Sequence, residues 1–222
     1  MKRRVAILIS GRGSNMAALI EAAKAPDFPA EIVTVISNRA DAQGLEKAAA
    51  SGIATSVIES KPFGKDRAGF HAVLQRLLDE KGVDLICLGG FMRLFTAEFV
   101  RRWYGKLLNI HPSLLPSFPG LDPHGQALAA GVKISGATVH LVIPETDAGP
   151  VLMQGAVAVA DDDTAETLAA RILRLEHRIY PEALRLLASG KVRLEGDFCR
   201  ISGQASPDGT LVWPALDETS SG

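Results

Sequence analysis

The stretch VAILI at residues 5–9, followed by SGRGSN at residues 10–15, decides the fold. Five consecutive apolar residues are typical of a strand that is buried on both faces of a sheet. A glycine-rich loop follows at once, and residues 16–25 then read as a helix that ends before Pro26. This order of strand, glycine loop and helix predicts the first unit of a parallel α/β sheet.

Strands and helices alternate along the rest of the chain. Further strands are expected at residues 32–36, 54–58, 84–88, 106–110, 137–143 and 151–160, and helices at 45–50, 66–81, 96–103 and 163–187. This alternation predicts an α/β fold: an open, mostly parallel twisted sheet with helices on both faces, Rossmann-like in its N-terminal half. A short turned segment joins the last two strands, so we expect an antiparallel or mixed edge there.

The longest expected helix begins at Asp163. Asp163 is placed to cap it, with Glu166 three residues later in a capping-box arrangement, and Pro181 is expected to kink it. The acidic run 161–163 is expected to be a solvated stretch that caps this helix and not a metal site. Short strand-like pieces follow, and the polar tail at residues 218–222 is expected to be disordered.

The composition is that of an ordinary globular protein, with 47% hydrophobic and 22% charged residues among 222. A formal net charge of -1 gives no basic field that would favour nucleic acid or an anionic membrane. The two cysteines, Cys87 and Cys199, lie far apart, which favours reduced thiols in a cytoplasmic protein. The apolar run after residues 1–4 is too short for a signal peptide or a membrane span.

Polar and glycine residues follow three of the expected strands. They are residues 11–15 after the first strand, 89–93 after the fourth, and Asn109 with His111 at the end of the fifth. Ligands of open α/β sheets bind outside the carboxyl ends of the strands. We therefore expect these three segments to converge on one crevice.

The first of these loops suits a phosphate group. Its backbone N–H groups and the helix N-terminus favour an anion, and Ser14 and Asn15 add side-chain donors. A dinucleotide site is less consistent with the sequence, because Met16 breaks the third glycine of the pattern and Asn38 stands where an acid would bind a ribose. An ordinary helix-capping turn is the other alternative for this loop.

Asn109 and His111 lie two residues apart on one strand, so their side chains face the same side. An amide can donate a hydrogen bond to an oxyanion, and an imidazole can shuttle a proton or, when charged, stabilise negative charge. A lone histidine at a strand end is often structural. Its pairing with an amide at the functional edge of the sheet favours a catalytic role.

Two acidic residues complete the set of candidates. Asp147 lies in the turn-rich loop 144–150, where the local sequence is also that of an ordinary turn. Glu176 shares a helical stripe with apolar residues and therefore needs a partner or a ligand, unless it extends to solvent or forms a salt bridge. The apolar residues of that stripe are Leu168, Ile172, Leu175, Ile179 and Ala183.

No metal is expected. The histidines His71, His140 and His177 have no ligand spacing with the two cysteines.

Five segments together resemble the folate-dependent phosphoribosylglycinamide formyltransferases of purine synthesis. They are ISGRGSN at 9–15, GFMRL at 90–94, NIHPSLLP at 109–116, DAGP at 147–150 and EHRIYP at 176–181. The resemblance implies the formyltransferase fold in a single domain over residues 1–200. Within it, residues 1–105 would form the phosphate-binding half and 106–200 the catalytic and folate-binding half. Residues 201–222 would be a C-terminal extension, partly disordered.

The resemblance also assigns roles to particular residues. Gly13, Ser14 and Asn15 would hold a ribonucleotide phosphate, and Glu176 would contact its ribose. Arg67 would meet the glutamate tail of a reduced folate, and the backbone from Ile143 to Asp147 would bind the pterin. The folate would also lie against Met92, Arg93, Leu94, Phe95 and Asn109.

The implied reaction moves the formyl group of 10-formyltetrahydrofolate, a cosubstrate, to the amine of glycinamide ribonucleotide. A tetrahedral oxyanion would accept a hydrogen bond from Asn109 and be stabilised by charged His111. Asp147 would favour that charge and help the proton leave the amine. No metal and no covalent enzyme intermediate are needed. The expected partners are these small molecules, in a monomer or homodimer.

The sequence departs from the family pattern at two places. DPHG at residues 122–125 stands where many members carry a histidine after Pro-Gly-Leu, so the contacts of that loop are open. Ala148 replaces a frequent glycine and is expected to be tolerated if its φ is negative.

Three other functions are less consistent with the sequence than this one. A transfer-RNA formyltransferase would need a basic surface and usually a C-terminal domain, and a formyltetrahydrofolate hydrolase usually carries an N-terminal regulatory domain. A non-catalytic nucleotide-binding module gives no reason for Asn109, His111 and Asp147 to occur together.

Overall fold

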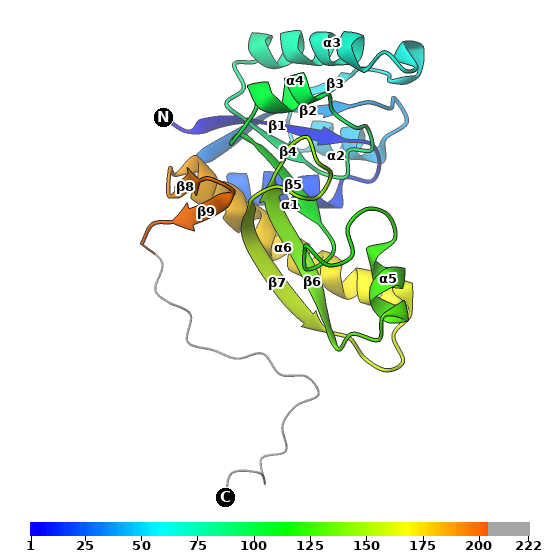
Figure 1. The fold of residues 1–222 in the computed structure, drawn as a ribbon. Coiled ribbons are helices and arrows are strands. Elements are labelled where there is room, and N and C mark those ends of the chain that lie inside the picture. The colour runs from blue at the N-terminus through cyan, green and yellow to red at the C-terminus, as the bar shows by residue number, and fades with distance from the viewer. Residues whose placement is uncertain (204–222) are drawn as a thin grey trace, which may run out of the picture.

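The computed structural model describes residues 1–203, which form a seven-stranded sheet, a small hairpin and the helices that cover the sheet (Figure 1). The sheet strands are β1 (Arg3–Ile9), β2 (Ala30–Ser37), β3 (Thr55–Val57), β4 (Leu85–Leu88), β5 (Leu107–His111), β6 (Ile134–Leu141) and β7 (Val151–Ala158). The helices are α1 (Ser14–Ala23), α2 (Gln43–Ala50), α3 (Arg67–Glu80), α4 (Ala97–Arg102), α5 (Pro123–Ala129) and α6 (Ala165–Ala188), with a 3-10 turn η1 (Lys61–Phe63). The hairpin is β8 (Val192–Glu195) with β9 (Phe198–Ile201). The expectation of a disordered tail at 218–222 lies outside the described residues.

The strand order is β3-β2-β1-β4-β5-β6-β7. The first five of these strands pair in parallel, and β6 and β7 are added antiparallel. This confirms the mostly parallel sheet and its antiparallel edge. Because β5 is parallel on one side and antiparallel on the other, its end meets residues from both parts of the chain.

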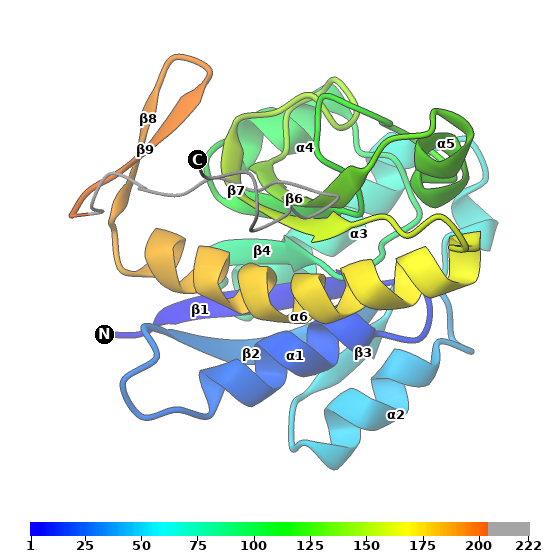
Figure 2. The same ribbon diagram turned by 90° about the horizontal axis from the view of Figure 1, so that it is seen from below.

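β1 explains why both faces of the sheet are covered. Val5, Ile7 and Ile9 belong to a core with α1, α2 and α6, whereas Ala6 and Leu8 belong to a core with α3 and α4. Figures 1 and 2 show these two layers of helices on opposite faces of the sheet. A strand that is apolar on both faces is what such a three-layer arrangement requires. Among the helices of the described part, none combines the length and the apolarity that crossing a bilayer needs.

The cap of α6 differs from the prediction. Thr164 is the N-cap, and it forms a reciprocal capping box with Thr167 where Asp163 and Glu166 were expected. Asp163 is neither the cap nor solvated, because both its carboxylate oxygens accept hydrogen bonds from Arg171, at 2.6 and 2.9 Å. Those hydrogen bonds lower the pKa of Asp163. α6 includes Pro181 and continues to Ala188.

α5 was not predicted. Asp122 precedes it with a positive φ of 53°, and its side chain accepts a hydrogen bond from the backbone N–H of Gly125 at 3.2 Å. Ala127 of this helix packs with Ala137 and Leu168 in a third apolar cluster. The DPHG segment, which departs from the family pattern, therefore starts a helix that packs beside β6 and α6.

Candidate active site

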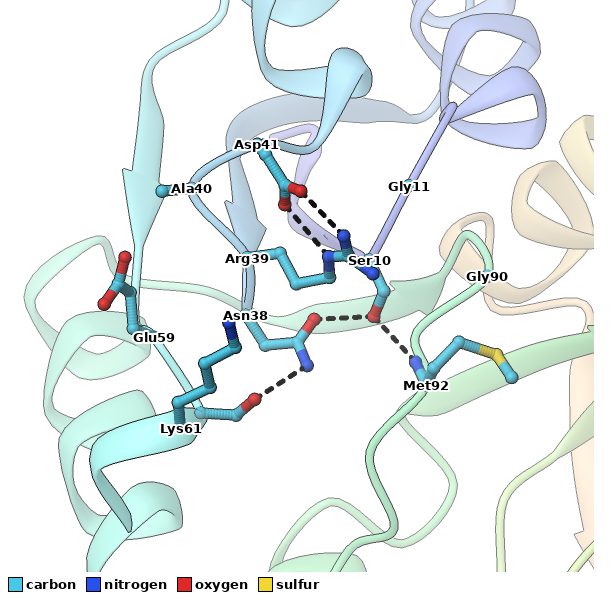
Figure 3. Close-up of a pocket in the computed structure, with 11 residues that line it drawn as sticks. Ser10, Gly11, Asn38, Arg39, Ala40, Asp41, Glu59, Lys61, Gly90 and Met92 are labelled. Carbon is cyan, nitrogen blue, oxygen red and sulfur yellow. Dashed lines mark hydrogen bonds and ion pairs between the residues drawn. The ribbon is translucent and has the colours of Figure 1, made fainter. Parts of the chain in front are cut away.

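A buried polar network joins the carboxyl ends of β1, β2 and β4. The Ser10 hydroxyl donates to Asn38 Oδ1 at 2.6 Å and accepts from the Met92 backbone N–H at 2.7 Å. Asn38 in turn donates to the Ser60 hydroxyl at 3.3 Å. Figure 3 shows this network on the floor of a cavity of about 710 Å³ that also includes Gly11 and Gly90. The loops after β1 and β4 are thereby held together, as the sequence predicted, and the loop after β2 joins them, which was not predicted.

The glycine loop ends in a helix N-terminus that no side chain caps. Gly13 is the N-cap of α1 with a φ of 68°, and within residues 1–203 no side-chain capping hydrogen bond is made there. A Cβ atom at Gly13 would lie 3.1 Å from the Gly44 Cα, so glycine is needed for its conformation and for this approach. The first N–H groups of α1 are thus left for an anion, with Ser14 and Asn15 beside them.

Glu176 faces this loop from α6. Its Oε2 accepts a hydrogen bond from Asn15 Nδ2 at 2.7 Å, although the two residues are 161 positions apart. Glu176 is 5% exposed, and burial raises the pKa of its carboxyl group. Within residues 1–203, the carboxylate on the apolar stripe therefore has a neutral partner at the anion loop, and not a salt bridge.

One turn further along α6, Tyr180 reaches the ends of two strands. Its fully buried hydroxyl lies 3.0 Å from the Leu88 carbonyl oxygen and 3.2 Å from that of Leu108. Leu108 directly precedes Asn109, so α6 supports the strand that carries the candidate amide. Tyr180 was not among the predicted site residues, and its position on the same helical face as Glu176 is the signal that could have identified it.

His111 and Asp147 meet at the end of β5. His111 Nδ1 lies 3.5 Å from Asp147 Oδ2, and the two side chains are only 8% and 10% exposed. The other ring nitrogen, Nε2, lies 3.0 Å from the Phe118 carbonyl oxygen, and the Gly120 N–H donates to Asp147 Oδ2 at 2.9 Å. Both nitrogens of His111 thus face oxygen atoms that can accept hydrogen bonds.

Asn109 reaches this pair through His140, a residue to which the sequence gave no role. Asn109 Nδ2 lies 3.1 Å from His140 Nε2, which lies 3.8 Å from Asp147 Oδ1. We call Asn109, His111, His140 and Asp147 the catalytic corner. His140 therefore links the three predicted catalytic residues into one cluster, and their catalytic role stays a prediction. His140 was not predicted because it meets Asn109 only through strand pairing, and the two residues are 31 positions apart in the sequence.

A cavity of about 240 Å³ opens beside the catalytic corner. Seven of the eight residues predicted to bind folate line it: Arg67, Arg93, Leu94, Phe95, Asn109, Ile143 and Asp147. Met92 lines the neighbouring cavity of Figure 3 instead. Phe95 forms one wall and stacks on His71, with ring centroids 5.4 Å apart.

Arg93 is tied to protein groups at the rim of this cavity. Its guanidinium lies over the Phe70 ring, 4.5 Å from the centroid. Its nitrogens are also 3.4 Å from the carbonyl oxygens of Ser60, Gly64 and Asp66. This side chain therefore holds the segment before Arg67 as well as facing the cavity.

Two further expectations concern the loop and metals. The positive φ in the loop falls on Asp147, at 54°, and not on Ala148, which agrees with alanine being tolerated at 148. Among residues 1–203, no three His, Cys, Asp or Glu side chains are grouped so as to hold a metal ion. The prediction of a metal-free site stays a prediction.

The sequence model of the family described as formyl transferase matches residues 3–184. The chain belongs to this family, and it is a transferase with the formyl transferase fold.

Its relatives identify the branch of the family. The chain is 40% identical over 203 residues to the phosphoribosylglycinamide formyltransferase of Escherichia coli, with 91% of this chain and 95% of that protein covered. It is 51% identical over 203 residues to the bovine trifunctional purine biosynthetic protein adenosine-3, covering 90% of this chain but only 20% of that protein. The chain thus spans about a fifth of the length of such trifunctional relatives.

Solved structures give the same result. The glycinamide ribonucleotide transformylase 1 of Symbiobacterium toebii matches with a TM-score of 0.87 and 45% identity, covering 90% of this chain and 94% of that one. A formyltetrahydrofolate deformylase from Pseudomonas syringae matches with a TM-score of 0.84 and 27% identity, covering 90% of this chain and 66% of that one.

Proposed function

We propose that this chain transfers the formyl group of 10-formyltetrahydrofolate to the amine of glycinamide ribonucleotide, in de novo purine synthesis. The observation that carries the proposal is the His111–Asp147 pair, at 3.5 Å, next to Asn109 and on the same sheet edge as the uncapped N-terminus of α1. Relatives of nearly the same length that are named for this activity support it.

The acceptor would bind through its phosphate. The backbone N–H groups that follow Gly13, with the side chains of Ser14 and Asn15, supply donors for a dianion. Glu176 would accept hydrogen bonds from ribose hydroxyls while it keeps its bond from Asn15. Within residues 1–203 this buried carboxylate accepts a side-chain hydrogen bond from Asn15 alone, so it has acceptor capacity left for such hydroxyls.

The folate would occupy the cavity beside the catalytic corner. Leu94, Phe95 and Val142 supply apolar contact, and the backbone of 143–147 supplies hydrogen-bonding groups for a pterin. Exposed Arg67 at the rim would meet the glutamate carboxylates. This placement brings the formyl carbon toward Asn109.

The neutral amine would attack the formyl carbon, and a tetrahedral oxyanion would form. Asn109 Nδ2–H would donate to the oxyanion, and the positive charge of His111 would stabilise it and help protonate the leaving folate nitrogen. Asp147 would hold His111 in its charged form and take the proton of the amine, through water if they do not touch. The amine nitrogen gains the formyl carbon, and the folate nitrogen regains a proton.

The test follows the absorbance change that accompanies loss of the formyl group from 10-formyltetrahydrofolate. With glycinamide ribonucleotide present, we expect formyl loss matched one to one by formylated ribonucleotide. No absorbance change, with or without the ribonucleotide, would favour a non-catalytic nucleotide-binding module. Glycinamide lacking the ribose phosphate is the matched control acceptor and should react poorly, because it lacks the anion.

A formyltetrahydrofolate hydrolase is the second candidate, because a deformylase shares the fold at 27% identity. In a hydrolase, water would take the place of the amine, and the ribonucleotide would not be needed. Release of formate at the full rate without ribonucleotide would favour this function. Dependence of the rate on ribonucleotide would reject it.

A further inference from the structure

Two buried polar residues of β6 lie opposite the two predicted catalytic residues of β5. In the antiparallel register, Asn109 faces His140 and His111 faces Thr138. Directly opposite residues of such a pair lie on the same face of the sheet and contact each other. The β6–β7 register shifts between Val139 and His140, and irregularities of this kind often re-aim a side chain next to an active site.

The partners of the His140 ring determine where its proton lies. Nδ1 is 3.2 Å from the Leu141 carbonyl oxygen, which can only accept, so Nδ1 carries the hydrogen. In a neutral ring, Nε2 then has a lone pair and accepts a hydrogen bond. The Asn109 atom that faces it at 3.1 Å is Nδ2, a donor, so the two assignments agree.

The surroundings keep this ring neutral. His140 is 2% exposed, and burial lowers its pKa against the opposing effects of the Leu141 carbonyl and Asp147, while the nearby His111 lowers it further. Asp147 Oδ1 lies 3.8 Å from Nε2, too far for a hydrogen bond. An unprotonated Nε2 and a carboxylate oxygen both carry lone pairs, which keep the two atoms apart. Asp147 contacts His111 through its other oxygen, Oδ2.

The orientation of the Asn109 amide matters for the proposed reaction. Rotated by half a turn, the amide would present Oδ1 where a donor is needed, and it would repel an oxyanion. Nδ2 has two hydrogens, and within residues 1–203 its hydrogen bond to His140 uses one of them. The second hydrogen remains for the substrate in the cavity that Asn109 lines.

We infer that His140 is a positioning residue: its Nε2 lone pair holds the Asn109 amide with the nitrogen, and not the oxygen, toward the reacting formyl group. The effect of His140 on catalysis rests on the proposed function, whereas the contact between His140 and Asn109 does not. The contact is a hydrogen bond between two protein side chains that exists before any substrate binds.

The first test is a pair of substitutions at 140. His140→Leu removes the acceptor, and we expect kcat to fall about 10- to 100-fold, because a misdirected amide loses most of one oxyanion donor. His140→Gln offers an amide oxygen to the same Nδ2–H, and we expect it to recover most of that loss. In both variants the affinity for the ribonucleotide should stay near wild type. His177→Gln, a half-buried imidazole of α6, is the matched control and should leave kcat unchanged.

The second test combines His140→Leu with Asn109→Ala. If His140 acts through Asn109, its substitution should have almost no further effect on kcat once the amide is gone. A full additional loss in the double variant would overturn the inference, and so would equal losses in His140→Leu and His140→Gln.

A third measurement does not depend on activity. Nuclear magnetic resonance of the substrate-free protein should detect coupling across a hydrogen bond from Asn109 Nδ2 to an unprotonated His140 Nε2. A protonated Nε2 without such coupling would overturn the inference even in an active enzyme. If the wild type transfers no formyl group, the proposed function fails, and this coupling alone decides whether His140 holds Asn109.

Discussion

The glycine loop at the end of β1 and the catalytic corner at the end of β5 lie on the same edge of the sheet, but they are built differently. The loop offers backbone N–H groups at the N-terminus of α1, and Asn15 is fixed there by a side-chain hydrogen bond to Glu176. In the catalytic corner, side chains hold one another: Asn109 contacts His140, and both histidines face Asp147. Backbone donors tolerate side-chain changes, whereas a cluster of side chains does not. Substitutions in the two regions should therefore affect different kinetic constants.

The largest effect is expected for His111→Ala. Loss of the charged ring should lower kcat by ~10²–10³, since one preorganised stabilising group is removed. The ribonucleotide affinity, measured by calorimetry, should remain near wild type because the anion loop is untouched. Turnover close to wild type would contradict the role of His111 and the contrast between the two regions.

Asn15→Ala should act on binding and not on turnover. It removes one donor to the phosphate and the amide that donates to buried Glu176, so we expect the ribonucleotide Kd to rise about 10-fold. The folate Kd in the same variant is the internal control and should change little. Ser14→Ala should shift the same constant by less. Equal losses for both ligands would remove the phosphate assignment.

A buried imidazole outside both regions sharpens the contrast. His71 packs against both Phe95 and Phe99, and burial lowers its pKa to about 4, with smaller effects from Arg93 and Arg67. Between pH 6.5 and about 4, the unfolded chain binds a proton at this residue that the folded chain does not. The stability that neutral His71 contributes is present above pH 6.5 and is lost as the pH falls through about 4.

His71→Gln should therefore lose less stability than the wild type on acidification, by on the order of 1 kcal/mol. Urea unfolding at neutral pH and near the lower end of this range measures the difference. Turnover at neutral pH should stay close to wild type. The same acid loss in both proteins would show that other groups account for it.

The smallest effect is expected for Arg67→Ala. Arg67 is an exposed cation at the rim of the folate cavity, so its removal should weaken folate binding only about 2- to 5-fold, and less at high salt. Arg76→Ala, an exposed cation on the same helix outside the cavity, is the control. A weaker affinity for the ribonucleotide in Arg67→Ala would contradict the assignment of Arg67 to the folate.

Local patterns predicted the parallel half of the molecule well. The strand at 5–9, its glycine loop and the following helix are specified by neighbouring residues, and the structure places them as expected. The loops of β1, β4 and β5 converge because parallel strands end at one edge. Glu176 was recognised from its helical stripe, although its partner Asn15 was not.

The errors come from interactions that are distant or in competition. His140 acquires its place only when β6 folds back antiparallel onto β5. Asp163 has the local features of a helix cap, but Arg171, two turns along, binds its carboxylate, so Thr164 takes that position. α5 has only seven residues, and its Asp122-Pro123 start also fits a turn. Arg93 lines the cavity where it was expected, but its contacts with three backbone carbonyl groups were not predicted.

The turn of α6 between Glu176 and Tyr180 has a consequence for which acceptors fit. Glu176 contacts the anion loop, and Tyr180 contacts the strand ends beside Asn109. Four residues of helix rise by about 6 Å, and a helix of this kind hardly stretches or compresses. This turn of α6 therefore fixes the distance between the two ends of the site. A phosphorylated amine that is shorter or longer by a bond or two would be held at one end and miss the other.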